Sequence, residues 1–519
     1  MDVYHKILRK YWGYPAFRPL QEDIIHSVCA GRDTLGLMPT GGGKSVTFQV
    51  PALAMEGICL VITPLIALMR DQVDNLRRVG IKATAVYSGM GRQEIVAELE
   101  NCVSGQYKFL YVSPERLATG LFREKLQAMN VCLLVVDESH CISQWGYDFR
   151  PSYLHIADIR EQLPGVPVLA LTATATPEVV DDIQRRLLFK EKNVFRTSFV
   201  RPNLAYIVRR TEDKLGTLAY ILGKVPGTAI VYARNRKLTK EVAIFLQQSG
   251  ISADFFHAGL SREEKVIRQS RWKNNECRVI VATNAFGMGI DKPDVRLVIH
   301  LDMPESLEEY FQEAGRVGRD SRKAFAVALC TDTDSFHLKK RIDDEFPEKK
   351  LIGKVYEALG DYFRIQEGQG KDIVYNFELT DFYSTCQFPP LQVHHALKLL
   401  ELSGYIEYCE GMDESSFQTA PQITYTHPRV RKNAIIIPSS AYEERRERMK
   451  KRISKVVEYM DGEHICRSRL LLSYFGEKNT EDCGCCDVCL SKNDSGLNNR
   501  DFNAIRDLLL ELLSTRQPL

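Results

Sequence analysis

The feature that most constrains the fold of this chain is a series of short apolar runs, each ending in a group of glycine, hydroxyl or carboxyl side chains. The first five runs lie at 34–37, 58–63, 108–112, 133–136 and 166–171, and segments with helical spacing separate them. Continuous apolar runs that alternate with helices are typical of parallel strands, which are buried on both faces. The pattern up to about residue 197 therefore predicts a parallel sheet covered by helices on both faces.

The first run leads into the sequence M-P-T-G-G-G-K-S at residues 38–45. Glycines let backbone N–H groups approach phosphate oxygens, and the N-terminus of a following helix favours negative charge. Lys44 can reach the terminal phosphates and Ser45 can ligate magnesium. A glycine-rich turn without a nucleotide is the disfavoured alternative. The predicted phosphate-binding residues are Thr40, Gly41, Gly42, Gly43, Lys44 and Ser45.

Upstream of this loop, residues 11–21 read Y-W-G-Y-P-A-F-R-P-L-Q and lead into a helical pattern at 21–30. Phe17, Arg18 and Gln21 could form a platform and an amide hook for an adenine ring. The same residues would serve equally well as the cap of the helix.

The apolar run at 133–136 delivers Asp137 and Glu138 to the end of a buried strand, and a loop rich in aromatic and polar residues follows as far as Pro151. Adjacent carboxylates suit a metal ion and a water molecule, and exposed aromatic rings suit stacking. We expect nucleotide chemistry to meet a polymer in this segment. An ordinary strand followed by a loop with a structural Trp145 is the alternative.

Hydroxyl groups follow three other strands of the first block, in T-P at 63–64, in S-P at 113–114 and in T-A-T-A-T at 172–176. Hydroxyl and N–H groups at strand ends suit phosphodiester oxygens, which fix position without reading sequence. They could equally cap the helices that follow. The threonines at 172–176 could hydrogen-bond the acidic pair.

A second block follows the link at 198–204, with strand-like runs at 228–232, 253–256, 279–282 and 297–301. It has no second G-K-S sequence, so we expect it to contribute to nucleotide hydrolysis from across a cleft.

Two segments of the second block support that expectation. Residues 283–291 supply a glycine turn and the carboxylate of Asp291, and residues 310–320 place Arg316 and Arg319 three positions apart on one predicted helical face. An arginine from a second domain can stabilise the transferred phosphoryl group, an effect of about 10³–10⁵ in rate. A solvated helix face is the alternative.

The order and wording of these motifs resemble the superfamily 2 helicases and, within them, the RecQ family, from residue 11 to about residue 490. The resemblance rests on F-R-P-L-Q, M-P-T-G-G-G-K-S, D-E-S-H-C-I-S-Q-W-G-Y-D-F-R-P, L-T-A-T-A-T, F-G-M-G-I-D-K-P-D-V-R and Q-E-A-G-R-V-G-R-D, in family order. It implies an α/β fold with two tandem RecA-like parallel-sheet domains, at 1–204 and 205–340, followed by a mainly helical zinc-binding region.

The resemblance also implies roles for the nucleotide-site residues. Arg18 and Gln21 would contact adenine, and Lys44 would contact the phosphates of ATP. Ser45 and Asp137 would hold Mg²⁺, Glu138 would orient or deprotonate the attacking water, and Arg319 with Arg316 would act as the arginine finger. The implied DNA contacts are Ser143, Gln144, Trp145, Phe149 and Arg150.

Five of the 14 cysteines lie between Cys466 and Cys489. Cys483, Cys486 and Cys489 are each three apart, and with Cys466 they supply the four thiolates that a closed tetrahedral Zn²⁺ site requires. The resemblance selects the same four and leaves Cys485 as a bystander. Redox-active thiols are the alternative.

Residues 341–435 interrupt the usual RecQ pattern. Their order of short strand, helix, proline-started helix, strand and returning strand is that of a winged-helix insertion. A small packing module is the alternative to a module that binds DNA or a partner. The helix predicted at 442–460 is rich in arginine and lysine but also carries glutamates, so it fits either a solvated face or a phosphate contact. We expect a helical zinc-binding module at 436–490, and a tail at 491–519 with a helix at 502–513.

The net charge of +2 gives no electrostatic signature for the whole chain, so any nucleic-acid surface must be local. The N-terminus lacks the apolar core of a signal peptide, and no apolar run is long enough to span a bilayer. We therefore expect a cytoplasmic protein, associated with the bacterial nucleoid and without a membrane partner.

The resemblance implies an ATP-dependent 3′–5′ DNA helicase of recombination and repair. Its expected substrates are single-stranded DNA and tailed or branched duplex DNA, with a single-stranded DNA-binding protein as a candidate partner. The alternative is a DNA-dependent ATPase that acts as a binding or strand-annealing switch with little unwinding. An RNA helicase is a third, disfavoured, interpretation.

Overall fold

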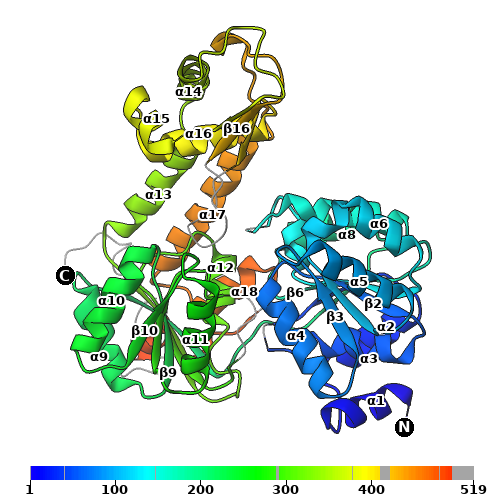
Figure 1. Cartoon of the computed structure of the whole chain (residues 1–519). Helices are drawn as coiled ribbons and strands as arrows, with labels where there is room; N and C mark the ends of the chain where they lie inside the picture. The colour runs from blue at the N-terminus through cyan, green and yellow to red at the C-terminus, as the bar shows by residue number, and fades with distance from the viewer. Residues whose placement is uncertain are drawn as a thin grey trace, which may run out of the picture.

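The computed structural model describes residues 2–39, 41–146, 148–287, 292–376, 378–409, 421–478 and 480–493. Two α/β units stand beside each other, and a smaller group of helices and strands extends from the second unit (Figure 1). None of the helices in the described parts of the chain is both long and apolar enough to cross a membrane.

The first α/β unit is built on seven parallel strands in the order β3-β4-β2-β5-β6-β1-β7. They are β1 (Thr34–Leu37), β2 (Ile58–Ile62), β3 (Ala83–Val86), β4 (Phe109–Val112), β5 (Val131–Val136), β6 (Val168–Thr172) and β7 (Val194–Arg196). Its helices are α1 (Val3–Trp12), α2 (Gln21–Cys29), α3 (Val46–Ala54), α4 (Ile66–Arg78), α5 (Arg92–Val103), α6 (Gly120–Gln127), α7 (His155–Glu161) and α8 (Pro177–Arg186). Short 3₁₀ turns are η1 (Pro114–Ala118), η2 (Ser139–Ile142) and η3 (Pro151–Leu154). The five predicted strands are confirmed within two residues at each end, but β3 and β7 were missed.

The strand register decides where the functional groups meet. Leu37 at the end of β1 pairs with Thr172, and Val136 at the end of β5 pairs with Ile62. Because all these strands are parallel, the segments that follow them emerge at one edge of the sheet. The phosphate loop, the acidic pair and the hydroxyl turns therefore share this edge.

The second α/β unit has six parallel strands in the order β10-β11-β9-β12-β13-β8. They are β8 (Leu204–Arg210), β9 (Thr228–Tyr232), β10 (Ala253–Phe256), β11 (Val279–Ala282), β12 (Val295–His300) and β13 (Ala324–Cys330). Its helices are α9 (Lys214–Lys224), α10 (Arg236–Gln248), α11 (Arg262–Lys273) and α12 (Leu307–Ala314). The four predicted strands are confirmed, and β8 and β13 complete the sheet.

Beyond the second unit, α13 (Asp334–Glu345) packs against α17 (Glu443–Asp461), and the two helices carry the insertion at their far ends (Figure 1). The insertion contains α14 (Lys349–Tyr362), β14 (Val374–Asn376), α15 (Leu379–Cys386), α16 (Pro390–Leu402), β15 (Ile406–Cys409), β16 (Gln422–Tyr425) and the turn η4 (Lys432–Ala434). Its strands form an antiparallel sheet in the order β14-β16-β15, and α16 packs on α14. This matches the order predicted for a winged-helix module, with α14 added in front.

The chain then continues into α18 (Arg467–Tyr474) and α19 (Asp487–Asn493). Cys466 directly precedes α18, Cys483, Cys485 and Cys486 precede α19, and Cys489 lies within α19. The helix predicted at 502–513 lies outside the described residues.

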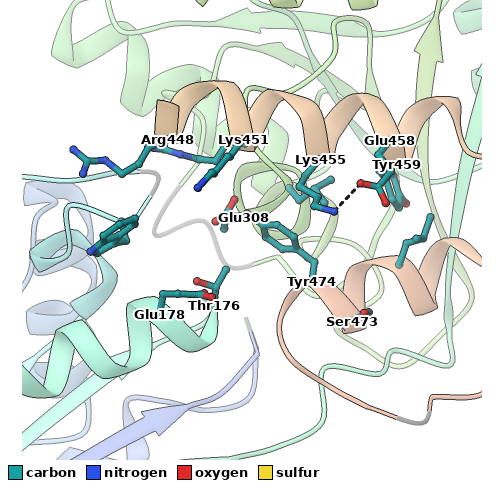
Figure 2. Close-up of a pocket in the computed structure, with 14 residues that line it drawn as sticks. Thr176, Glu178, Glu308, Arg448, Lys451, Lys455, Glu458, Tyr459, Ser473 and Tyr474 are labelled. Carbon is teal, nitrogen blue, oxygen red and sulfur yellow. Dashed lines mark hydrogen bonds and ion pairs between the residues drawn. The ribbon is translucent and has the colours of Figure 1, made fainter. Parts of the chain in front are cut away.

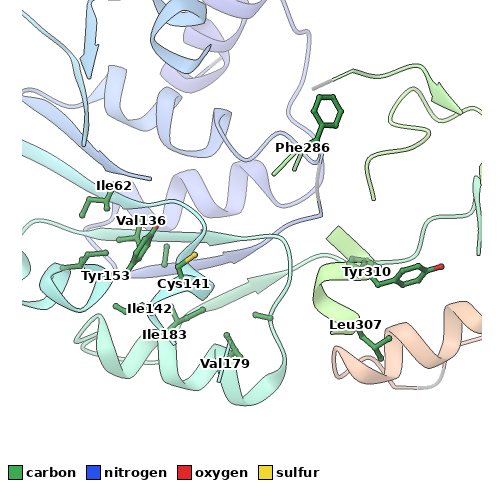
Figure 3. Close-up of a cluster of buried hydrophobic side chains, with 14 of the residues drawn as sticks. Ile62, Val136, Cys141, Ile142, Tyr153, Val179, Ile183, Phe286, Leu307 and Tyr310 are labelled. Atoms are coloured by element: carbon green, nitrogen blue, oxygen red, sulfur yellow. The ribbon is translucent and has the colours of Figure 1, made fainter. Parts of the chain in front are cut away.

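The edge of the first sheet rests on a packed apolar layer. Val179 and Ile183 of α8 lie beneath Cys141 and Ile142, in the segment that follows β5 (Figure 3). Burial of one such side chain contributes roughly 1.5–3 kcal/mol. The hydroxyl of buried Tyr153 donates to the carbonyl of Asp137 over 3.0 Å. These contacts hold the backbone that carries the acidic pair in place.

Candidate nucleotide, nucleic-acid and zinc sites

The phosphate loop connects β1 to α3, and two of its glycines need their lack of a side chain. Gly41 and Gly43 have φ angles of 81° and 78°, in the left-handed region that favours glycine. A Cβ atom at Gly43 would also collide with the side-chain amide of Gln21. Thr40 lies outside the described residues.

Two of the three residues predicted to hold adenine contact this loop. The guanidinium of Arg18 donates to the carbonyl of Gly41 over 2.6 Å, and the amide of Gln21 donates to the carbonyl of Gly43 over 2.9 Å. The ring of Phe17 meets His5 edge-on, with centroids 4.8 Å apart. Gln21 also accepts from the backbone N–H of Arg18, but no side chain caps the start of α2, so the helix-cap alternative is wrong.

The acidic pair stands at the end of β5, opposite Lys44. Lys44 Nζ lies 3.6 Å from Glu138 Oε1, and Glu138 has a φ angle of 48°. A left-handed conformation at a non-glycine residue stores strain, and such residues gather at functional sites.

The two carboxyl groups of the pair differ in acidity. Burial raises the pKa of Asp137 to about 6, and the neighbouring Glu138 carboxylate adds to the shift. Burial also acts to raise the pKa of Glu138, but Lys44, His140 and Arg316 outweigh it and hold that pKa below its ordinary value. Glu138 therefore keeps its negative charge, and Asp137 is the first of the two to take up a proton.

His140 is a site residue that sequence reasoning missed. Its Nδ1 lies 2.9 Å from Thr172 Oγ1 and 3.4 Å from Glu138 Oε2, and the residue is fully enclosed. The prediction that the threonines at 172–176 bond the acidic pair directly is wrong, because Thr172 reaches Glu138 through this imidazole. Its position two residues after Glu138 was the available signal.

Arg316 and Arg319 of the second α/β unit face the edge of the first. A Cβ atom built on Gly41 would stand 3.4 Å from side-chain carbons of Arg319. Arg316 is buried, and its charge helps to lower the pKa of Glu138. The prediction that both lie on one helical face is wrong, because α12 ends at Ala314 and the arginines stand in the turn that follows. Asp291 lies outside the described residues.

The aromatic loop separates into exposed and buried positions. The side chain of Trp145 is 48% exposed, and Gln144 and Phe149 are partly exposed beside it. Ser143 is buried instead, and its hydroxyl donates to Asp182 over 2.7 Å and accepts from the N–H of Trp145. The expectation that Ser143 contacts DNA is therefore replaced by a role in holding the loop.

Arg150, the remaining loop residue, is held by its own neighbours. Its guanidinium donates to Asp148 over 3.0 Å and reaches the carbonyl of Pro64 at 3.4 Å. Arg150 therefore joins the loop to the T-P turn that follows β2.

The hydroxyls of Thr63 and Ser113, at the T-P and S-P turns, are buried at the same edge. Neither has a hydrogen-bond partner within the described parts of the chain. Helix α4 has Leu65 at its N-cap, and Ser113 makes no side-chain cap bond to η1. The capping alternative is therefore wrong for these two residues.

The four predicted zinc ligands come together between α18 and α19. The Sγ atoms of Cys466, Cys483, Cys486 and Cys489 all lie within 4.8 Å of one another. The Cys466 and Cys486 sulfurs are 3.9 Å apart, close to the edge of about 3.8 Å that a tetrahedron with Zn–S bonds of about 2.3 Å has. Cys485 turns away toward the carbonyl of Leu204. The cluster fits a structural zinc ion.

Comparison with known protein families gives three matches along the chain. Residues 18–183 match the DEAD/DEAH box helicase family, residues 213–321 the helicase conserved C-terminal domain, and residues 429–490 the RecQ zinc-binding family. The first two matches fall on the two parallel-sheet units, and the third covers α17 and the cysteines.

Relatives agree with these matches. The chain is 40% identical over 372 residues to a probable ATP-dependent DNA helicase RecS of Bacillus subtilis, covering 71% of this chain and 73% of the relative. It is 38% identical over 363 residues to the ATP-dependent DNA helicase RecQ of Haemophilus influenzae, covering 69% of this chain and 59% of the relative. The chain thus spans little more than half the length of that RecQ protein.

Solved structures share the fold. Mss116p bound to single-stranded RNA and AMP-PNP aligns with a TM-score of 0.55 at 14% identity, over 77% of this chain and 89% of that one. The Mycobacterium smegmatis helicase Lhr bound to single-stranded DNA and AMP-PNP aligns with a TM-score of 0.51 at 18% identity, over 81% and 60%. With the family models and the RecS relative, the chain belongs to the RecQ family of superfamily 2 helicases.

Proposed function

We propose that this protein is an ATP-dependent DNA helicase that translocates 3′ to 5′ on single-stranded DNA and unwinds tailed or branched duplexes in recombination and repair. One observation carries the proposal: Arg319 packs against Gly41, and Arg316 acts on Glu138, from across the boundary between the two α/β units. Because hydrolysis would need groups from both units, the nucleotide state would control how the units sit together. Such coupling is what a translocating motor requires.

Each residue at the edge of the first sheet would have a separate role in ATP hydrolysis. Lys44 would leave Glu138 for the terminal phosphates, and Glu138 would then be free to orient the attacking water and accept its proton. Mg²⁺, held by Ser45 and Asp137, would neutralise charge on the phosphate oxygens. Arg316 and Arg319 would stabilise the charge that develops on the transferred phosphoryl group. Phe17, Arg18 and Gln21 would hold the base.

The two remaining sites would bind DNA and hold the zinc-binding module in place. Trp145 would stack on a base, an interaction of about 1–3 kcal/mol that tolerates any sequence. The four cysteines would hold Zn²⁺ and fix α18, whose following residues contact the first unit. The carbonyl of Phe475 accepts from Arg196 at 3.3 Å, and Glu477 accepts from Ser198 at 2.8 Å. We expect the protein to act on the nucleoid, with a single-stranded DNA-binding protein as a partner.

The test measures ATP hydrolysis with and without single-stranded DNA, and unwinding of a duplex with a 3′ tail, for the wild type and Lys44→Ala. The proposal expects hydrolysis stimulated by DNA and unwinding of the 3′-tailed duplex, both lost in the variant. A 5′-tailed duplex is the matched control and should remain paired. Stimulated hydrolysis without unwinding would replace the helicase proposal with a DNA-dependent switch or annealing factor.

A further inference from the structure

A cleft lies between the aromatic loop, α16 of the insertion and α17. It consists of two adjoining cavities of about 510 and 730 Å³, and Arg448 and Arg452 line both. Arg448, Lys451 and Lys455 follow one side of α17, opposite Thr176 and Glu178 at the start of α8 (Figure 2). The insertion and the first α/β unit therefore meet around one basic helix.

Three arginines of α17 face this cleft. Arg445, Arg448 and Arg452 are spaced by three and four residues, which places them on one side of a helix. Arg448 approaches a carboxylate of Glu444 at 3.6 Å, but Arg445 and Arg452 form no ion pair with any residue that the structure describes. Arg446, on a different side of the same helix, is paired with Asp343 at 2.9 Å.

The arginine face carries an electrostatic cost. Burial lowers the pKa of Arg445 and of Arg448, and the neighbouring charge of Arg452 adds to both shifts, opposed by Glu345 and Glu444 respectively. Like charges held together in a partly buried cleft repel one another, and a bound anion would relieve that repulsion.

Acidic residues also line the cleft, and two of them are paired with basic side chains. Glu458 is paired with Lys455 at 2.7 Å, and Glu305 is paired with Arg341. Glu308 accepts from the hydroxyl of Tyr474 at 2.8 Å, and Glu401 accepts from the N–H of Tyr408 at 3.2 Å. Glu178 and Glu345 complete the acidic lining.

Aromatic rings and a second basic wall complete the cleft. The guanidinium of Arg448 lies 5.3 Å from the ring centre of Trp145, and Phe149 lines the larger cavity. Lys398 and His395 of α16 line the same cavity from the insertion. Positive groups beside exposed aromatic rings suit a single nucleic-acid strand, with its phosphates on the arginines and its bases on the rings.

We propose that Arg445, Arg448 and Arg452 of α17, together with Lys398 of α16, bind the phosphates of single-stranded DNA as it passes the aromatic loop. The insertion then forms one wall of the strand path. This inference rests on the proposed function, and it adds a phosphate-binding surface and a role for the insertion.

Salt dependence of DNA binding tests the inference. Affinity for an oligothymidylate is measured by fluorescence anisotropy over a series of NaCl concentrations. Each phosphate contact with a single strand contributes about 0.7 to the slope of log affinity against log salt. The double variant Arg445→Ala/Arg452→Ala should reduce the slope by about 1.4, and Lys398→Ala by about 0.7. The charge-preserving double variant with lysine at both positions should keep most of the slope.

Arg446→Ala is the matched control, because its side chain points away from the cleft, and it should leave the slope unchanged. Thermal midpoints and zinc content confirm that each variant is folded. An unchanged affinity and slope in the double alanine variant overturns the inference, and so does a loss confined to a duplex probe. If Trp145→Ala still weakens binding in that case, the proposed helicase function stands without this surface. A wild type that binds no oligothymidylate overturns both.

Discussion

Two regions gather positive charge where separate parts of the chain meet. One is the nucleotide edge, the edge of the first sheet that carries the phosphate loop and the acidic pair, and the other is the arginine cleft lined by Arg445, Arg448 and Arg452. They differ in whether their basic side chains have partners within the protein. At the edge, Lys44 pairs with Glu138 and Arg18 donates to the carbonyl of Gly41. In the cleft, Arg445 and Arg452 have no carboxylate partner among the residues that the structure describes. A ligand at the edge must exchange one set of contacts for another, whereas a strand in the cleft meets charge that is already available.

The difference has a physical consequence for selectivity. At the nucleotide edge a ligand must replace contacts between protein groups, so only a ligand whose geometry matches several groups at once binds tightly, as the phosphates and the metal of a nucleotide do. Unpaired positive charge on a helix face binds any phosphodiester. The affinity increases with the number of phosphate contacts and depends strongly on salt. Substitutions that remove one region should therefore spare ligand binding at the other.

The largest effect should follow removal of the zinc ion, which should abolish DNA binding in the cleft and leave nucleotide binding at the edge of the first sheet intact. Binding of structural zinc releases about 10–16 kcal/mol in small zinc domains, so Cys486→Ser should unfold the segment that holds α18. Tyr474 and Leu470 of α18 line the cleft. We expect loss of bound zinc, a lower thermal midpoint and weak DNA binding, with ATP binding retained.

Cys485→Ser is the matched control, because its sulfur points to Leu204 rather than to the cluster. Zinc content by atomic absorption and nucleotide affinity by fluorescence separate the two outcomes. A Cys486→Ser protein that keeps its zinc and its oligothymidylate affinity would contradict the assignment of the four ligands.

The next largest effect should be a loss of ATP hydrolysis at the nucleotide edge, with DNA binding in the cleft retained. Arg319→Ala and Arg316→Ala should each lower the hydrolysis rate by about 10³–10⁵, because they remove charge that stabilises the transferred phosphoryl group. Binding of ATP and of single-stranded DNA should change much less. Single-turnover hydrolysis and equilibrium binding measure the two properties separately. Arg322→Ala, an exposed position nearby, should behave as wild type; a similar loss there would point to a general disturbance of the turn.

The nucleotide edge could be predicted from sequence because its residues are adjacent in motifs. The loop at 38–45 and the pair Asp137 and Glu138 each follow an apolar run, and parallel strands bring their ends to one edge. The edge strand β3 was missed because it carries only one large apolar side chain, and β7 because it is only three residues long. His140 was missed because its partner, Thr172, lies in another strand.

The cleft could not be predicted in the same way. Its walls come from residues near 145, 398 and 450, and no pattern within one segment shows that they meet. The charged face of α17 fitted a solvated helix equally well, and only the placement of α16 and the aromatic loop distinguishes Arg445 from Arg446. The end of α12 at Ala314 differs from the predicted helix at 310–320 because Gly315 and Gly318 favour a turn there.

A smaller effect is expected at Trp145, where the aromatic loop enters the cleft. Trp145→Ala should weaken binding of single-stranded DNA by about 5–150-fold, which corresponds to the 1–3 kcal/mol of one stacked base. Its salt slope should stay near the wild-type value, because no phosphate contact is lost. Trp145→Phe keeps an aromatic face and should recover most of the affinity. Equal losses in both variants would indicate that the indole supports the loop rather than a base.

The smallest expected effect concerns α12, which joins the two regions. Its Glu308 lines the cleft, and its end leads into the turn that carries Arg316. Between them, burial raises the pKa of Glu309 to about 8, with the carboxylates of Glu313 and Glu305 adding to the shift. An unfolded glutamate loses its proton near pH 4.3.

Between about pH 4.3 and about pH 8 the folded protein therefore keeps a proton on Glu309 that the unfolded chain has released, so stability falls as the pH rises through this window. Glu309→Gln has no proton to lose and keeps an oxygen for the bond from the N–H of Glu305. Relative to the wild type, its thermal midpoint should rise by about 2–4 °C on going from pH 5 to pH 9, because the wild type loses up to about 4 kcal/mol over this range and each kcal/mol shifts the midpoint of a chain of this length by about 1 °C. Glu124→Gln, at a side chain that is 72% exposed, should show no such trend. Parallel melting curves for Glu309→Gln and the wild type across this range would mean that the carboxyl of Glu309 is ionised in the folded protein, and that α12 joins the two sites without a buried proton.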